Sequence, residues 1–300
     1  MVMEFIKQLA VIICRPYIRY SPLNIGSKWL FQKVKRIPRH FVAKTCFGVS
    51  IEGSTTDLIQ RAIYYFGIWE PNLSSYLIRT LAPGDTFVDV GANIGYYTLL
   101  SSKIVGNSGQ VVAIEPSPTI YNMLAVNLSR NSVRNVTVHQ AAVLDRETEI
   151  QIFLGNEHNI GATSIQPTKH AHELEATVRA SPLHQFLTEE QKKSVRFIKI
   201  DAEGAEPEVL RGMKPILENH PRCLEIMVEI TISESMSGTH SDHPVIEMMT
   251  SYGFHPYEVV NCYDLNSYIV NRRPSPPTRL HRPLVKSTDI IFSHRDAEYL

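Results

Sequence analysis

Short apolar runs rich in β-branched residues alternate with helical patterns from about residue 80 onward, and this rhythm constrains the fold most. Buried strands are predicted at residues 86–90, 111–114, 136–143, 197–200 and 224–230, and helices at 97–104, 118–128, 206–217 and 244–252. Strands joined by helical crossovers form a mostly parallel sheet with helices on both faces. The sequence therefore predicts an α/β, Rossmann-like protein.

Composition narrows the partners and the compartment. Thirty basic and thirty acidic side chains give a formal net charge of zero. No global field attracts the chain to nucleic acid, so no nucleic-acid partner is predicted. The four cysteines form no CxxC motif, which argues against a disulfide framework or a zinc ribbon and favours reduced thiols and a cytoplasmic location.

Residues 1–75 are predicted to be an N-terminal extension, helical or mixed, preceding a catalytic domain at 76–300. Its signals are a strand near residues 47–51 and a helix at 57–65. The apolar run at 9–14 is too short for a membrane span, which needs about 20 residues. The region up to residue 44 is locally basic. Peripheral membrane contact through residues 1–44 is left open, although a solvated helix face is the preferred interpretation.

Three loops are expected to shape an acceptor site. The first, 155–172, lies between strand-like pieces at 149–154 and 177–181. The second is 231–243, and the third is a proline-rich extended segment at 271–287, before a last strand at 289–292.

The strongest local motif follows the first predicted strand. Asp89 is delivered by that strand, and Gly91, Asn93 and Gly95 form a turn before a helix. Glycines allow close backbone approach, and a helix start offers free N–H groups. Because Asn93 replaces a glycine of GxGxxG, and because an acid suits a cationic ligand better than a pyrophosphate, a dinucleotide is disfavoured. A glycine-rich turn without a ligand is the alternative.

Glu115 ends the second strand, twenty-four residues after Gly91. An acid at this point of a parallel sheet can accept both hydroxyls of a ribose. A solvated glutamate at a strand end is the alternative. The two motifs together indicate a nucleoside-containing ligand at the carboxyl edge of the sheet.

Asp201 and Glu203 follow the strand predicted to neighbour the first one. Two acids on one short turn repel each other unless a cation or a proton is shared, which favours a functional role. Glu206 is assigned to the helix dipole instead.

These motifs resemble the FkbM-type S-adenosylmethionine-dependent methyltransferases. The resemblance rests on DVGANIGYYTLL at 89–100, IEPSP at 114–118 and KIDAEGAEPEVLRG at 199–212, and covers roughly residues 45–295. It implies a class I methyltransferase sheet with an antiparallel last strand, and S-adenosylmethionine as the cofactor. It also implies that Asp89, Gly91, Asn93 and Gly95 line the methionine and ribose side of that cofactor, that Glu115 holds the ribose hydroxyls, and that Ala141 and Ala142, with Asp145 as a weaker candidate, lie near the adenine.

The expected chemistry is O-methylation of a small-molecule or glycan acceptor, sugar-containing or a natural product. A hydroxyl acceptor must lose its proton, and a general base typically contributes about 10²–10⁴-fold. Asp201 is predicted to be that base or to orient the acceptor, with Glu203 second. A non-catalytic cofactor-binding or scaffold protein remains an alternative, as does a nicotinamide-dependent dehydrogenase, which the absence of GxGxxG disfavours.

Other clusters give weaker hypotheses. No metal site is predicted, since the two histidine groups in polar loops, His170, His172 and Glu173, and His240, Asp242 and His243, are typical of solvent-facing residues. A substrate lid or an ordinary surface loop is expected at Asn159, Gly161, Thr163 and Ser164.

Overall fold

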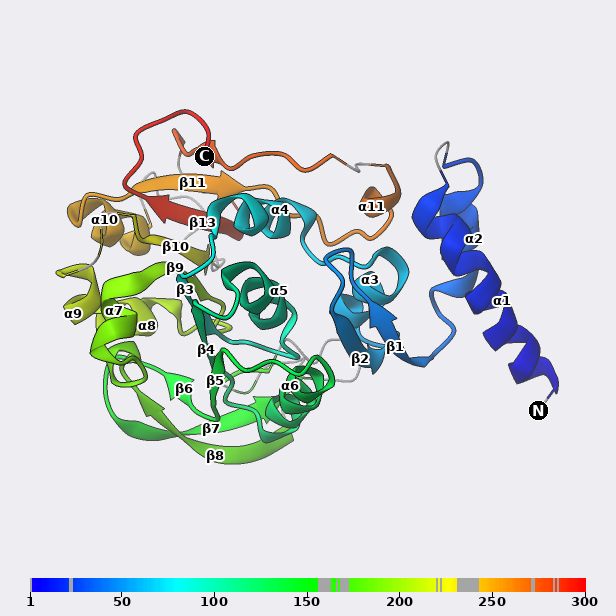
Figure 1. Ribbon diagram of the computed structural model, residues 1–300, viewed down its shortest axis with the longest axis horizontal. Coiled ribbons are helices and arrows are strands. Elements are labelled where there is room, and N and C mark those ends of the chain that lie inside the picture. Colours follow the sequence, from blue (N-terminus) through cyan, green and yellow to red (C-terminus); the bar gives the residue numbers. More distant parts are fainter. Residues whose placement is uncertain are drawn as a thin grey trace.

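A central eight-stranded sheet organises the molecule (Figure 1). The computed structural model describes residues 2–21, 24–155, 163–165, 167, 173–219, 221, 223–230, 243–270, 273–282, 284 and 286–300. In spatial order the strands are β12 (Thr278–Arg279), β11 (His255–Val259), β13 (Thr288–Ser293), β10 (Glu225–Ile230), β9 (Val195–Ile200), β3 (Thr86–Val90), β4 (Gln110–Ile114) and β5 (Val136–His139).

The strand directions confirm the predicted fold class. β10, β9, β3, β4 and β5 are mutually parallel, and β13 runs antiparallel to both β10 and β11. Only the two-residue strand β12 adds a further antiparallel pair, with β11. The mostly parallel sheet with an antiparallel last strand is that of a class I methyltransferase.

Helices cover both faces of the sheet, as predicted. One face carries α4 (Pro71–Thr80), α5 (Tyr96–Val105) and α6 (Pro118–Arg130), and the other carries α8 (Glu206–Gly212), α9 (Lys214–Leu217) and α10 (Pro244–Ser251). Strand side chains alternate between the faces: Phe87 and Phe197 pack in the core with α4 and α5, and Val88 and Ile198 in the opposite core. Two short helices, α7 (Glu189–Ser194) and α11 (Ser267–Val270), also belong to the part of the chain after residue 80.

The order of the sheet also locates the ligand edge. β3 is the middle one of the five parallel strands, and the chain continues to β4 on one side and returns to β9 on the other. Such a switch point leaves a crevice beyond the carboxyl ends of the strands. Val90 in β3 pairs with Ile114 in β4 and Ile200 in β9, so the segments that follow all three strands leave the sheet at the same level.

Two predicted elements are divided in the structure. The strand expected at 136–143 ends at His139, and Ala142–Val143 forms β6 in a separate three-stranded sheet with β8 (Glu173–Ser181) and β7 (Thr148–Leu154). The helix expected at 206–217 breaks at Met213 into α8 and α9, with a proline in the first turn of α9. The hydrophobic pattern continues through both breaks, and it therefore predicted one element each time.

The N-terminal region packs on the sheet domain. It contains α1 (Val2–Tyr20), α2 (Ser27–Val34), the hairpin β1 (His40–Lys44) and β2 (Ser50–Ser54), and α3 (Leu58–Phe66). α3 matches the predicted helix and is capped by Asp57, whose carboxylate accepts from the Gln60 N–H at 2.9 Å. The boundary predicted after residue 75 falls inside α4, and one apolar core continues on both sides of it. No helix in the described ranges is long and apolar enough to cross a bilayer.

Candidate functional site

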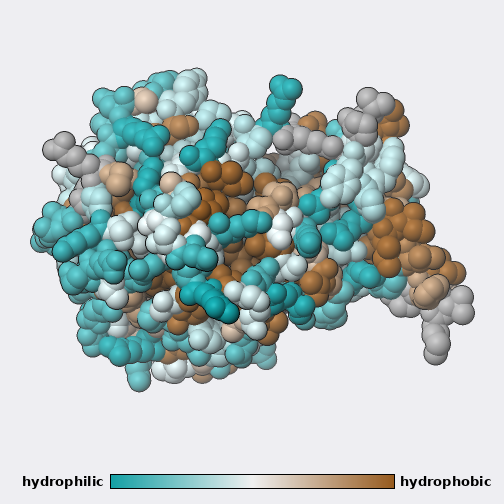
Figure 2. Space-filling model, viewed as in Figure 1, coloured by the Kyte–Doolittle hydropathy of each residue, from teal (hydrophilic) through white to brown (hydrophobic). Residues whose placement is uncertain are grey.

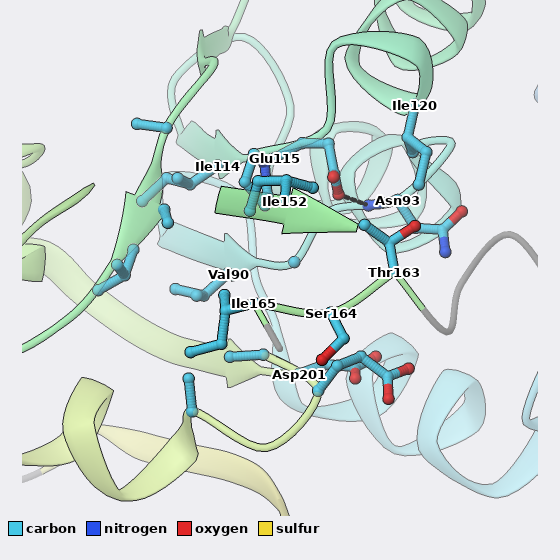
Figure 3. A pocket seen from close by; sticks show the side chains of 18 of the residues that line it. Val90, Asn93, Ile114, Glu115, Ile120, Ile152, Thr163, Ser164, Ile165 and Asp201 are labelled. Carbon is cyan, nitrogen blue, oxygen red and sulfur yellow. Dashed lines mark hydrogen bonds between the residues drawn. The ribbon is translucent and has the colours of Figure 1, made fainter. Parts of the chain in front are cut away.

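A cavity opens at the carboxyl ends of β3, β4 and β9 (Figure 3). Its polar lining comes from Asn93, Glu115, Thr163, Ser164, Asp201 and Glu203. Its apolar lining includes Val90, Ile114, Ile120, Ala141, Ala142, Val143, Leu144, Ile152 and Ile165. In Figure 3, Glu115 and Asn93 lie on one side of the cavity and Asp201 on the other. A mainly apolar cavity with a few convergent polar groups is the usual form of a small-molecule site.

Glu115 is fixed at the end of β4 by backbone donors. Its carboxylate accepts from the N–H of Asn93 at 2.9 Å and from the N–H of Ser117 at 3.0 Å, and the residue is buried. Burial raises the pKa of Glu115 to about 7 against the effect of these two donors. The structure thus places Glu115 on the cavity wall, held by the turn after β3.

The turn after β3 is built around Gly91. A glycine is needed there because another segment of the protein packs closely against it, and no ligand has to be invoked. Its φ is +74°, and a Cβ there would lie 1.9 Å from the Asp201 carbonyl oxygen. Gly95 also has a positive φ, and a Cβ there would lie 2.5 Å from Leu124 Cδ1. Both glycines therefore allow close packing within the fold. Gly91 lines the cavity, whereas Gly95 does not.

Asp89 is fully buried beside the cavity and does not line it. Its Oδ2 accepts from the Thr98 hydroxyl at 2.6 Å, and its Oδ1 has no hydrogen-bond partner. Burial raises the pKa of Asp89, and the nearby Lys199 ammonium opposes that shift. The structure thus separates Asp89 and Gly95 from the predicted residues Gly91, Asn93, Glu115 and Ala142, which all face the cavity.

Asp201 lies next to a buried cation. Lys199 donates from Nζ to Asp201 Oδ2 at 2.9 Å and packs over the Tyr97 ring, 5.4 Å from its centroid. Lys199 is buried, whereas the Asp201 side chain keeps about a third of its surface exposed. This pair leaves Asp201 accessible from the cavity and fixes its orientation.

Two further carboxylates follow the same edge. Glu229 in β10 pairs in register with Asp289 in β13. Since Val228 pairs with Ile200, which in turn pairs with Val90, Glu229 lies one residue further along than these paired residues. Burial, followed by the nearby Asp201 charge, raises the pKa of Glu229, and burial, followed by Glu70, raises that of Asp289. More carboxyls than cations gather here, which favours the protonated form of Glu229 and Asp289.

Glu203 sits on a turn that Glu206 holds. The Glu206 carboxylate accepts from the N–H groups of Ala202 and Gly204 at 3.0–3.1 Å. Glu203 has a φ of +47°, in the left-handed region that costs a residue with a side chain, and it is exposed at the cavity rim. Partial burial and the Asp201, Glu229 and Glu206 carboxylates raise its pKa. Glu206 thus stabilises the turn as well as starting α8.

A further buried acid, Glu70, comes from the loop before α4, and its role was not evident in the sequence. It is buried with a φ of +41°, and it accepts from the Tyr97 hydroxyl at 2.5 Å. Burial raises its pKa to about 7. Glu229 directly follows an apolar run in β10, and Asp289 directly precedes one in β13, and an acid beside a buried run was the available signal in the sequence.

The segment before β8 supplies the remaining wall. Ser164 pairs with Phe153 through two backbone hydrogen bonds of 2.9–3.0 Å, so Thr163 and Ser164 lie against the cavity. The other predicted lid residues, Asn159 and Gly161, are outside the described residues. Ala141 and Ala142 line the cavity, whereas Asp145 pairs with Arg146 and Arg211 away from it.

Metal ligation was not predicted. Among the residues that the structure describes, no group of three His, Cys, Asp or Glu side chains could hold a metal ion. His170, His172, His240 and Asp242 lie outside those residues.

The fold and the cavity together define an α/β protein of the class I methyltransferase type. Residues 89–256 match the methyltransferase FkbM domain family, and the chain belongs to that family. Residues 31–143 also match the protein-L-isoaspartate(D-aspartate) O-methyltransferase family. The family resemblance of the motifs is confirmed.

Curated relatives match part of the chain. Methyltransferase 1 of Beauveria bassiana is 28% identical over 151 residues, covering 44% of this chain and 59% of its own length. Protein-L-isoaspartate O-methyltransferase of Methanococcus maripaludis is 28% identical over 140 residues, covering 45% of this chain and 60% of its own length. The chain thus spans somewhat over half the length of these relatives.

Solved structures of similar proteins include an FkbM methyltransferase from Methylobacillus flagellatus, with a TM-score of 0.40 and 19% sequence identity. The match covers 71% of this chain and 44% of the Methylobacillus chain. Fibrillarin from Aeropyrum pernix, in complex with natively bound S-adenosyl-L-methionine, has a TM-score of 0.40 and 13% identity, covering 75% of this chain and 76% of its own.

Proposed function

We propose that this protein is an S-adenosylmethionine-dependent methyltransferase that methylates a hydroxyl oxygen of a sugar-containing or natural-product acceptor. The observation that carries the proposal is the placement of Glu115 and Asp201 on one cavity at the switch point of the sheet. Membership in the FkbM family supports the cofactor and the class of reaction. The two acids at the end of β9 support a hydroxyl acceptor.

The cavity residues fit a nucleoside. Ala142 and the aliphatic side chains around it offer an apolar surface for a purine ring. Glu115 retains acceptor capacity beyond its two backbone donors, and a carboxylate at this position can accept ribose hydroxyls. Asn93 holds the turn, since its own N–H donates to Glu115.

The acid-rich edge fits a cationic ligand group. Lys199 is a single buried cation near Asp89, Asp201, Glu229 and Asp289, all of them described residues. A positive group entering this edge would stabilise the ionised carboxylates. When bound, S-adenosylmethionine supplies an electrophilic methyl group on a positively charged sulfur.

Asp201 is assigned the role of orienting the acceptor hydroxyl and receiving its proton, with Glu203 as the second candidate. Lys199 fixes the Asp201 carboxylate on one side, and the partly exposed side chain stays accessible from the cavity. Positioning the acceptor for in-line displacement accounts for much of such a reaction, because holding two reactants together removes an entropic cost.

Cofactor binding is tested by calorimetry with S-adenosylhomocysteine. The wild type is expected to bind, and Glu115→Ala to lose at least tenfold in affinity, because a carboxylate that accepts two ribose hydroxyls is removed. The matched control is Glu149→Ala, which removes an exposed carboxylate of β7 and should leave the affinity unchanged. Absence of binding by the wild type, or equal affinities of Glu115→Ala and wild type, contradicts the proposal.

Catalysis is tested by formation of S-adenosylhomocysteine with a panel of hydroxylated sugars and glycosides. Asp201→Ala is expected to reduce turnover about 10²–10⁴-fold, as expected for removal of a general base, with a much smaller loss of cofactor affinity. Equal losses in both would reassign Asp201 to cofactor binding. Failure of the whole panel in a protein that binds the cofactor would favour the non-catalytic alternative.

A further inference from the structure

Exposed apolar side chains lie along the outward side of α1, and brown side chains gather there in Figure 2. At 100° per residue, eight exposed apolar positions from residue 5 onward fall on one continuous arc of about 140°, and exposed Met3 lies about 40° beyond its edge. The exposed residues on this arc are Phe5, Ile6, Leu9, Ile12, Ile13, Pro16, Tyr17 and Tyr20. We call these eight residues the apolar arc. A surface helix normally presents its polar side to water, so this orientation is reversed.

Contacts with the body of the protein fix that orientation. Val11 and Ile18, on the opposite side of α1, are fully buried. Arg15 donates from Nε to the Tyr64 carbonyl at 2.7 Å, and Arg19 donates from Nη1 to the Lys44 carbonyl at 3.2 Å. Rotating α1 to hide the apolar arc would expose the two aliphatic residues and break both hydrogen bonds.

The apolar arc continues onto the segment before α2. The Tyr17 hydroxyl donates to the Ile25 carbonyl at 2.5 Å, and the Ile25 side chain is exposed. Trp29 in α2 is 62% exposed, with the Lys33 ammonium over its ring at 5.7 Å. Exposed apolar surface of this extent marks an interaction site, and Tyr and Trp are enriched where one end of a ring is apolar and the other wet.

Charge identifies the partner. Residues 1–51 contain nine lysines and arginines and one acidic residue, which leaves 21 basic against 29 acidic residues in the rest of the chain. A cationic segment around an apolar face is attracted to anionic lipid headgroups, at about 1 kcal/mol, or fivefold in affinity, per Lys or Arg near the surface. Two copies of the chain meeting through this face would instead bring like charges together.

We infer that α1 and the start of α2 dock the protein on an anionic membrane surface. The apolar arc enters the boundary between headgroups and acyl chains, and exposed basic side chains of α2, such as Lys33 beside Trp29, contact the headgroups. The helix lies in the plane of the membrane, since it is not apolar enough to cross it. This property is separate from cofactor binding, which can be measured independently.

Vesicle co-sedimentation of the full chain tests the inference. Vesicles of phosphatidylcholine with about 30% phosphatidylserine have a negative surface. They should bind the wild type at least tenfold better than vesicles of phosphatidylcholine alone. Ile6→Glu with Ile13→Glu, both exposed in the free protein, should reduce binding at least tenfold. The matched control is Val126→Glu on α6, also exposed, which should bind like the wild type.

Fluorescence gives a second readout. The chain has two tryptophans, exposed Trp29 and buried Trp69, so a blue shift on vesicle binding should come from Trp29 and disappear in Trp29→Phe. Unchanged S-adenosylhomocysteine affinity shows that the variants remain folded. No wild-type binding to anionic vesicles, equal binding by the Ile6/Ile13 variant, or self-association in solution that this variant abolishes would each overturn the inference.

Discussion

Replacing Gly91 by alanine tests how the cavity is built. Gly91 has a φ of +74°, and its added Cβ would lie 1.9 Å from the backbone oxygen of Asp201. An ordinary van der Waals contact is at least 3.4 Å, so the two segments must separate by about 1.5 Å. The Asp201 N–H donates to the Val90 carbonyl at 3.1 Å, and this bond resists the separation.

The cost has two parts. An L-residue in the left-handed region costs about 1–2 kcal/mol, and forcing an extra group into a packed site costs about 1–3 kcal/mol. Gly91→Ala should therefore reduce the free energy of unfolding by about 2–5 kcal/mol. Since a displacement of about 1 Å in an active site can cost 10²-fold in rate, turnover should fall by at least that factor.

The matched control is Gly26→Ala. Gly26 has nearly the same φ, +71°, and a Cβ there meets no atom within 4 Å. It shares the backbone strain without the clash, and should cost about 1–2 kcal/mol with no loss of S-adenosylhomocysteine affinity.

Denaturant titration gives the two free energies, and calorimetry gives the affinities. If Gly91→Ala costs no more than Gly26→Ala and binds S-adenosylhomocysteine as the wild type does, close contact between the β3 turn and Asp201 does not shape the site. That result would falsify the reasoning from the glycine geometry.

Buried polar groups give three further tests. The Glu115 pKa of about 7 exceeds its ordinary 4.5, so the folded state keeps a proton that the unfolded state loses between these pH values. As the pH rises from 4.5 to 7, the free energy of unfolding should fall by about 3 kcal/mol more in wild type than in Glu115→Gln, and parallel denaturant curves would contradict this. Thr98→Val removes the hydroxyl that donates to Asp89 and should lower the free energy of unfolding by about 1–3 kcal/mol, measured by denaturant titration. Thr98→Ser keeps the hydroxyl and should leave that free energy nearly unchanged. Equal losses in the two variants would be inconsistent with the hydrogen bond. Glu206→Ala should loosen the turn after β9, with a several-fold loss of turnover and about 1–3 kcal/mol of stability. The half-buried Glu208, on the same helix, holds no part of the turn, so Glu208→Ala should leave turnover unchanged. Indistinguishable kinetics of the two variants would rule out this role.

The sequence predicted most of the central sheet, because buried parallel strands are continuous apolar runs and the helices between them repeat at 3.6 residues. It was wrong where one apolar run crossed a structural boundary. Ala142–Val143 belongs to the three-stranded sheet, where it pairs with β8, and not to the central sheet. Strand propensity does not tell which of two sheets a short apolar segment joins.

The site was predicted in part for a similar reason. Gly91, Glu115 and Asp201 were found because they directly follow strands whose order is restricted by the right-handed crossover. Glu229 and Asp289 were missed, since their importance comes from the cross-strand register that places them one level beyond Ile200, at the level of Asp201.

The sequence by itself determined the sheet, the glycine turn and the acids that end its strands, since these follow from local periodicity and residue chemistry. Only the tertiary structure decided that the Asp201 carbonyl leaves no room for a Cβ at Gly91 and that Lys199 pairs with the Asp201 carboxylate. It also decided that α1 turns its apolar side outward. Each of these depends on which atoms of distant segments meet, and hydrophobic periodicity carries no information about the partner that covers a given face.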